Sequence, residues 1–200
     1  MSTNINLCME RAKAELRDRL KRLELISIVE AKDIIGRYTA AVEGNFVPWM
    51  TAALVYAKSP SGRYAAKENL EVEISDNHQG MLRDFATSAN AEPSLEHYQT
   101  VQEEITSMRK LIGKGNGLEA LTVMATLENT SSIFIPYLAD LAKKRGSTNL
   151  QYTNIHGEAD KEHAQQFIWA IEDEIKLHGQ ADKKIDLAIS QTLDYLKVIF

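Results

Sequence analysis

Apolar residues recur at helical spacing along nearly the whole sequence, and this pattern restricts the fold more than any other feature. In segments such as 27–43 and 181–200 they fall at positions i, i+3, i+4 and i+7, which share one face of an α-helix. No run alternates apolar and polar residues as a half-buried strand does. The sequence therefore predicts an all-α protein.

Glycine, proline and serine residues divide this pattern into about seven helices, or eight if the short second and third segments are separate. The expected helices span residues 4–24, 27–43, 46–58, 63–89, 95–113, 118–145, 149–178 and 181–200. Pro136 lies inside the helix 118–145, where we expect a kink. A chain of 200 residues that is 44% hydrophobic can bury a substantial core, so one helical domain over residues 1–200 is predicted.

Charge, cysteine content and hydropathy argue against several classes of protein. The net charge is −5 and no cluster of Lys and Arg occurs, so nucleic acid is not an expected partner. Cys8 is the only cysteine, which excludes an internal disulfide and a cysteine-based zinc site. No segment approaches the roughly 20 apolar residues that span a bilayer, and residues 1–20 are predicted to form an amphipathic helix rather than a signal peptide. We therefore expect a soluble, cytoplasmic protein without a membrane partner.

Three polar residues share the apolar face of the predicted helix 149–178. His156, Asp160 and His163 follow one another at intervals of four and three residues within the stretch HGEADKEHAQQF. Tyr152 continues the same stripe, whereas the charged residues between the three fall on the opposite side. Taken alone, this pattern is as compatible with ordinary polar positions as with a metal site.

The predicted helix 63–89 carries a second pair of candidate ligands. Glu71 and His78 lie two helical turns apart on one stripe, which also contains Lys67. The ordinary alternative is a Glu71–Lys67 ion pair at i, i+4 and a histidine buried in the core.

Glu128 is the only acid on the apolar stripe of the helix 118–145, and its ordinary alternative is a hydrogen bond to Ser131 or Ser132. Three candidate carboxylates would then face the core, and each one buried without a partner costs several kcal/mol. Two divalent cations would compensate their charge. Imidazole and carboxylate ligands suit iron or manganese, and inward ligands on facing helices are how helical bundles build dimetal sites.

The combined pattern Glu71-x6-His78, Glu128 and His156-x3-Asp160-x2-His163 resembles the ligand set of the haem-oxygenase-like diiron oxidases and oxygenases. The resemblance spans the full chain and implies a haem-oxygenase-like bundle with two Fe(II)/Fe(III) ions and O2 as co-substrate. It also implies oxidation of a small amine- or carboxylate-bearing metabolite, such as an aromatic amino acid, by oxidative cleavage, decarboxylation or nitrile formation. In this family setting we expect specialised metabolism, an external electron donor and a homodimer.

The resemblance suggests catalytic roles for two further residues. Tyr152 would support or exchange electrons with the metal site, or alternatively be a core tyrosine, and Lys67 would neutralise Glu71 or hold a substrate carboxylate. The aromatic residues expected to line a substrate pocket, although they would equally suit a core, are Phe46, Trp49, Tyr56, Phe134 and Tyr137.

Two other functions stay open at the level of sequence. One is a metal-independent, thiaminase-like enzyme of the same fold, for which Cys8 would be the cysteine to test. The other is a non-enzymatic module that binds iron or a partner protein.

Overall fold

The computed structural model describes residues 4–178 and 181–200, apart from the side chains of residues 158–161. This part of the chain forms nine α-helices and one short 3-10 helix, and it contains no strand. The helices are α1 Ile5–Arg19, α2 Ile28–Val42, α3 Phe46–Tyr56, α4 Pro60–Ser75, α5 His78–Ser88, α6 Leu95–Ile112, α7 Gly117–Lys144, α8 Gln151–Ile175 and α9 Ala181–Ile199, and the 3-10 helix is Leu23–Leu25. The all-α prediction is confirmed, with nine helices in place of about seven.

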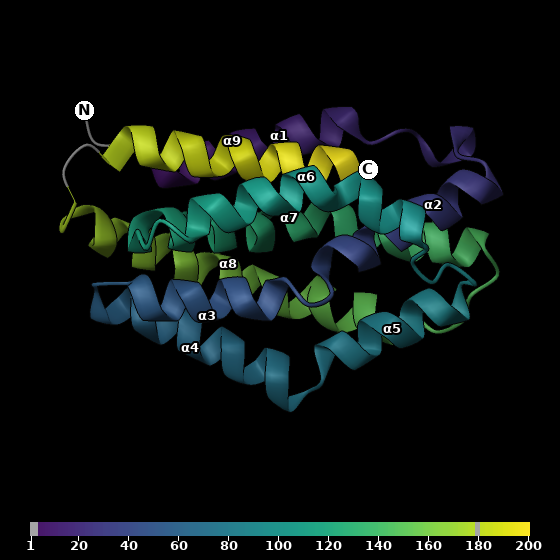
Figure 1. Ribbon diagram of the computed structural model, residues 1–200, viewed down its shortest axis with the longest axis horizontal. Coiled ribbons are helices and arrows are strands. Elements are labelled where there is room, and N and C mark those ends of the chain that lie inside the picture. Colours follow the sequence, from purple (N-terminus) through teal and green to yellow (C-terminus); the bar gives the residue numbers. More distant parts are fainter. Residues whose placement is uncertain (1–3, 179–180) are drawn as a thin grey trace.

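Helix α7 is the centre of the bundle. Figure 1 shows α1, α6, α8 and α9 running along it. Nearly every residue of its first half is buried, the polar ones included, so this segment is enclosed on all sides rather than along one face. The hydroxyls of Thr122, Thr126 and Thr130 each donate to the carbonyl four residues earlier, at 2.7, 2.7 and 2.6 Å. The helix continues through Pro136 to Lys144.

Helices α4 and α5 meet at an angle at one edge of the bundle (Figure 1). The sequence predicts one helix over 63–89, but the chain breaks at Asp76 and Asn77. Asn77 has a left-handed backbone, with φ of 54°, and its side chain accepts a hydrogen bond from the amide of Gly80. Asparagine tolerates this conformation better than most residues and is also a good N-cap. The break makes the buried face of α5 independent of the face of α4.

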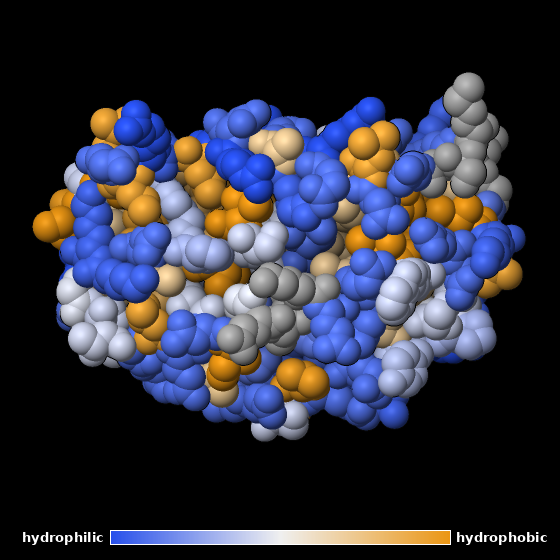
Figure 2. Space-filling view, turned by 180° about the vertical axis from the view of Figure 1, so that it is seen from behind, coloured by the Kyte–Doolittle hydropathy of each residue, from blue (hydrophilic) through white to orange (hydrophobic). Residues whose placement is uncertain are grey.

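The surface carries hydrophobic side chains in small, separated groups. Figure 2 shows this for the face opposite to that in Figure 1. Large exposed residues such as Leu25, Val29 and Leu95 lie near helix ends. None of the described helices is long and apolar enough to cross a membrane.

Candidate metal centre

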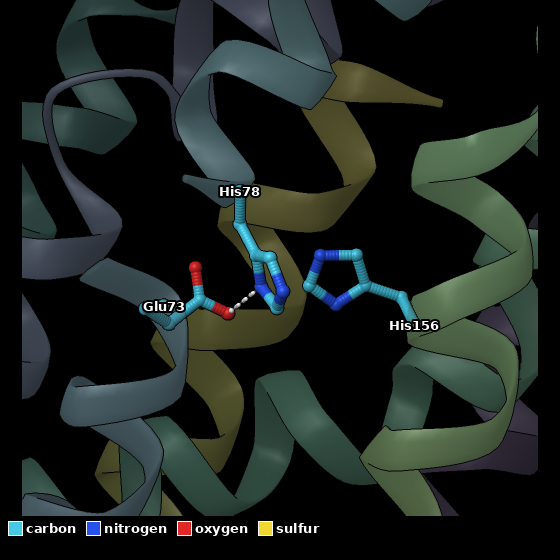
Figure 3. A group of neighbouring side chains, drawn as sticks. All are labelled: Glu73, His78 and His156. Carbon is cyan, nitrogen blue, oxygen red and sulfur yellow. Dashed lines mark hydrogen bonds and ion pairs between the residues drawn. The ribbon is translucent and has the colours of Figure 1, made fainter. Parts of the chain in front are cut away.

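Three potential metal ligands from three helices meet inside the bundle. Glu73 comes from the end of α4, His78 is the first residue of α5, and His156 lies in α8 (Figure 3). One ligand atom from each lies within 4.8 Å of the others. Nδ1 of His78 is 2.9 Å from Oε1 of Glu73, and the two imidazole rings are 4.6 Å apart, centroid to centroid. These three side chains could hold a metal ion.

The buried face of α4 explains why Glu73 points inward. Ala65, Asn69 and Glu73 are spaced by four residues and are all buried, and the small side chain of Ala65 lets α4 pack against α8. The amide nitrogen of Asn69 donates to the Ala65 carbonyl at 2.8 Å and lies 3.3 Å from Oε1 of Gln166 on α8. These contacts fix the rotation of α4 that presents Glu73 to the site.

A second pair of potential metal ligands lies on α7 and α8. Oε2 of the buried Glu128 is 3.8 Å from Nδ1 of His163. The Ser131 hydroxyl donates to the backbone carbonyl of Glu128, at 2.6 Å, and not to its carboxylate. Asp160 lies on α8 between the two histidines of that helix, but its side chain is outside the described residues. Helices α7 and α8 therefore add a carboxylate and an imidazole to the first group of potential ligands.

Tyrosines surround the histidine side of the site. The hydroxyls of Tyr38 and Tyr152 are 2.7 Å apart, and the Tyr152 ring is 4.5 Å from that of His156. Tyr195 is 1% exposed and, in the part of the chain that is described, its hydroxyl has no hydrogen-bond partner. Burial, with a smaller contribution from Tyr38, raises the pKa of Tyr195 well above its ordinary value. Tyr195 therefore stays a neutral phenol at physiological pH.

A cavity of about 630 Å³, its opening included, joins these groups. It is bordered by Glu73, His78, His156, Glu128 and the three tyrosines, and by Phe46 and Phe134 from the predicted aromatic set. Among the described residues, the acids that line it are Glu43, Glu73 and Glu128, and no lysine or arginine does. A described lining with acids and histidines but without lysine or arginine favours a cation.

Glu71 and Lys67 lie elsewhere. They form an exposed ion pair at 3.3 Å, and Glu73 stands beside His78 where the sequence predicted Glu71. The prediction assumed an unbroken helix, so that Glu71 and His78 would share a face. The turn at Asn77 removes that relationship. Ala65, Asn69 and Glu73 share one face of α4 at intervals of four residues, but the hydropathy of the sequence does not mark this face as the buried one.

The remaining aromatic candidates do not border the cavity. Trp49 and Tyr56 line a more open groove together with Arg109, and the Trp49 ring packs edge-on against Tyr195 at 5.4 Å. Tyr137 packs against Phe200, and burial raises the pKa of its phenol. Trp49 thus packs against the cavity residue Tyr195 without bordering the cavity itself.

The sequence profile of the iron-containing redox enzymes matches residues 37–191, which is most of the chain. The chain belongs to this family. Its fold is accordingly haem-oxygenase-like, as the resemblance of its candidate ligand set implied. No curated protein and no solved structure matches the chain significantly.

The donor set of this iron-containing redox enzyme fits the metal in the family description. Two imidazoles and a carboxylate converge from separate helices, and a further carboxylate and imidazole lie on the neighbouring pair. Mixed nitrogen and carboxylate ligands without thiolates suit iron. Glu73, His78 and His156 are therefore the residues that could hold an iron ion here.

Proposed function

We propose that this protein is an O2-activating, non-haem diiron enzyme that oxidises a small-molecule substrate. The observation that carries the proposal is the convergence of Glu73, His78 and His156 within 4.8 Å on the wall of a cavity. Glu128 lies on the same cavity and within 3.8 Å of His163. Carboxylates and histidines on facing helices are the usual donors of dimetal sites in helical bundles.

The candidate metal ligands form two groups, one for each of two ions. Glu73, His78 and His156 would hold one, and Glu128 and His163 would hold the other. Asp160, whose side chain is outside the described residues, is proposed as a further ligand on the sequence pattern His156-x3-Asp160-x2-His163. When bound, ferrous ions supply the electrons with which O2 is reduced, and an external electron donor would restore them.

The chain's own residues provide positioning and exclusion of water. The Tyr38–Tyr152 hydrogen bond fixes the ring that packs against His156, so it restricts the orientation of that imidazole. Leu82, Leu127 and Phe134 form an apolar wall, which keeps water away from the donors. A small organic molecule held there would lie beside the metal ligands.

A cysteine-based mechanism has little support in the structure. Cys8 lies in α1 and is not among the residues that border the cavity. Burial, followed by the charge of Asp186, raises the pKa of its thiol, whereas a nucleophilic cysteine needs a lowered pKa. The variant Cys8→Ala should therefore retain iron binding and turnover.

Anaerobic titration with Fe(II), followed by metal analysis, tests the proposal. We expect about two irons per chain, as in carboxylate-bridged bundle sites. Glu73→Gln and His78→Ala should each lower this stoichiometry, whereas the matched variant Glu71→Gln, on the same helix, should leave it unchanged. Loss of iron in Glu71→Gln but not in Glu73→Gln would show that α4 presents the other face to the metal. A folded wild-type protein that binds no iron would refute the proposal.

A further inference from the structure

We propose that the substrate is an amine with an apolar body, and that Glu43 binds its ammonium group. The inference rests on the proposed function in one respect, because it takes the same cavity as the substrate site. It is carried by the position of Glu43, by its partner Arg83, and by a buried hydroxyl that lacks a hydrogen bond.

Glu43 is the one acidic residue on the described cavity wall that is not a metal-ligand candidate. It follows the last residue of α2, and its side chain is 19% exposed. The other two acids, Glu73 and Glu128, lie with the histidines. With metal bound to those two, Glu43 would remain as the group that distinguishes substrates by charge. It would attract a cation and repel a carboxylate.

Arg83 now pairs with Glu43 from outside the cavity. The guanidinium of this α5 residue contacts the Glu43 carboxylate, its side chain is 62% exposed, and it does not line the cavity. The Arg83 guanidinium is largely exposed, so it stays well hydrated when it leaves the pair, and ion pairs with such a partner contribute little to stability. A ligand ammonium inside the cavity can therefore replace Arg83, which turns into solvent.

The rest of the cavity suits an apolar body with one more polar group. The wall of the same cavity includes the apolar residues Val42, Phe46, Leu82, Leu127 and Leu196. Tyr195 borders the same space, and no described residue accepts or donates a hydrogen bond at its buried hydroxyl. A buried hydroxyl without a partner is costly, so a ligand that supplies one is favoured.

Calorimetric titration of the metal-free protein at neutral pH tests the inference without interference from amine binding to iron. The probes are hexylamine and 2-phenylethylamine, compared with hexan-1-ol, 2-phenylethanol and hexanoate. We expect the amines to bind and the alcohols and hexanoate to bind at least about tenfold more weakly, as for a partly buried charge pair. Glu43→Gln should lower amine affinity about tenfold, and Arg83→Gln should raise it severalfold, because it frees the carboxylate.

The two variants form a matched pair, since each removes the same Glu43–Arg83 ion pair. A purely structural role for this pair would shift amine affinity in the same direction in both, and that result would overturn the inference. Glu73→Gln serves as the second control. If it abolishes amine binding while Glu43→Gln does not, the ammonium occupies the metal position and the inference fails.

Iron stoichiometry of the same variants separates this inference from the proposed function. Glu43→Gln and Arg83→Gln should bind as much iron as the wild type. Normal iron binding without selectivity for amines would overturn only the substrate class. Amine binding that depends on Glu43 in a protein that binds no iron would refute only the diiron proposal.

Discussion

Nδ1 of His78 lies 2.9 Å from Oε1 of Glu73, although the two residues are five positions apart in the chain. On one continuous helix, five positions would place them about 140° apart around the axis. The contact exists because α4 ends and α5 begins between them, with Asn77 in the left-handed region. The geometry of the candidate metal centre therefore depends on the backbone of a single residue that is not a ligand.

Substitutions at Asn77 should separate the contribution of its left-handed backbone from that of its N-cap hydrogen bond. Asn77→Gly keeps the left-handed backbone accessible and loses only the cap on Gly80, whereas Asn77→Ala loses the cap and strains the backbone. We expect Asn77→Ala to lower the free energy of unfolding by about 1–2 kcal/mol and Asn77→Gly by a few tenths. Urea denaturation measures this difference. We also expect weaker iron binding in Asn77→Ala but not in Asn77→Gly. Equal stability of the two variants would contradict the proposal that the left-handed backbone of Asn77 positions α5.

The hydroxyl pair Tyr38–Tyr152 should behave as one energetic unit. Each single change to phenylalanine breaks the same 2.7 Å hydrogen bond and should cost about 1 kcal/mol of folding free energy. The double variant should cost clearly less than the sum of the two, because the bond is already lost in either single variant. Thermal or urea unfolding of the four proteins completes the cycle. Additive costs would show that the two hydroxyls do not interact.

Replacing Gly36 by alanine should destabilise the protein, because the added methyl group would clash with a side chain of α6. A Cβ at this position would come within 2.3 Å of the His97 ring, which is buried and whose Nδ1 accepts the Ser94 amide in the capping box. We expect Gly36→Ala to destabilise the protein by about 1–3 kcal/mol, the cost of overpacking. In a His97→Ala background the same change should become neutral or stabilising, since alanine favours the helix. A melting series of the four proteins checks this, and a penalty that persists without the ring would contradict it.

Glu174 should stabilise the fold in a pH-dependent manner. Burial acts to raise the pKa of this fully buried carboxyl, but hydrogen bonds from Ser59, Lys58 and His178 outweigh it and leave the pKa below its ordinary value of 4.5. A group whose pKa is lowered in the folded state stabilises that state above pH 4.5 and loses this effect as the pH falls through the folded pKa.

The variant Glu174→Gln should therefore be less stable than the wild type by about 2 kcal/mol at neutral pH, because the hydrogen bonds of Lys58 and Ser59 lose a charged acceptor. The difference should shrink as the pH is lowered below 4.5. Urea denaturation at a series of pH values measures it. A difference that does not change with pH would show that the carboxylate charge is not what stabilises the turn between α3 and α4.

The fold was predictable because each helix carries its own periodic pattern and, in most cases, its own end signals. Ser27, Ser59 and Ser94 accept hydrogen bonds from helix N-termini, and Pro60 follows one of these caps directly. The burial of Glu128 and His156 was predicted correctly, because each lies on a long unbroken helix and shares a helical face with apolar residues.

Glu73 could not be identified in the same way. Its neighbours Val72 and Ile74 are apolar, yet Ile74 is 61% exposed, so hydropathy alone indicates the wrong face of α4. The deciding features are the small residues that pack against α8 and the turn at Asn77, and both depend on tertiary contacts. Trp169 of α8 shows the same limit, since a large aromatic side chain favours burial and this one is 59% exposed.

The threonine hydroxyls of α7 satisfy their own hydrogen bonds within the helix, and this changes what the neighbouring helices encounter. With each oxygen directed to a carbonyl of the same helix, Thr122, Thr126 and Thr130 offer mainly their methyl groups to the surrounding side chains. At these three positions α7 therefore presents a surface to the helices around it that is nearly as apolar as that of valine. Residues of those helices that contact Thr122 and Thr130 can therefore be exchanged for other apolar residues of similar shape, whereas Thr126 also contacts the sulfur of Met9 in α1, at 4.0 Å.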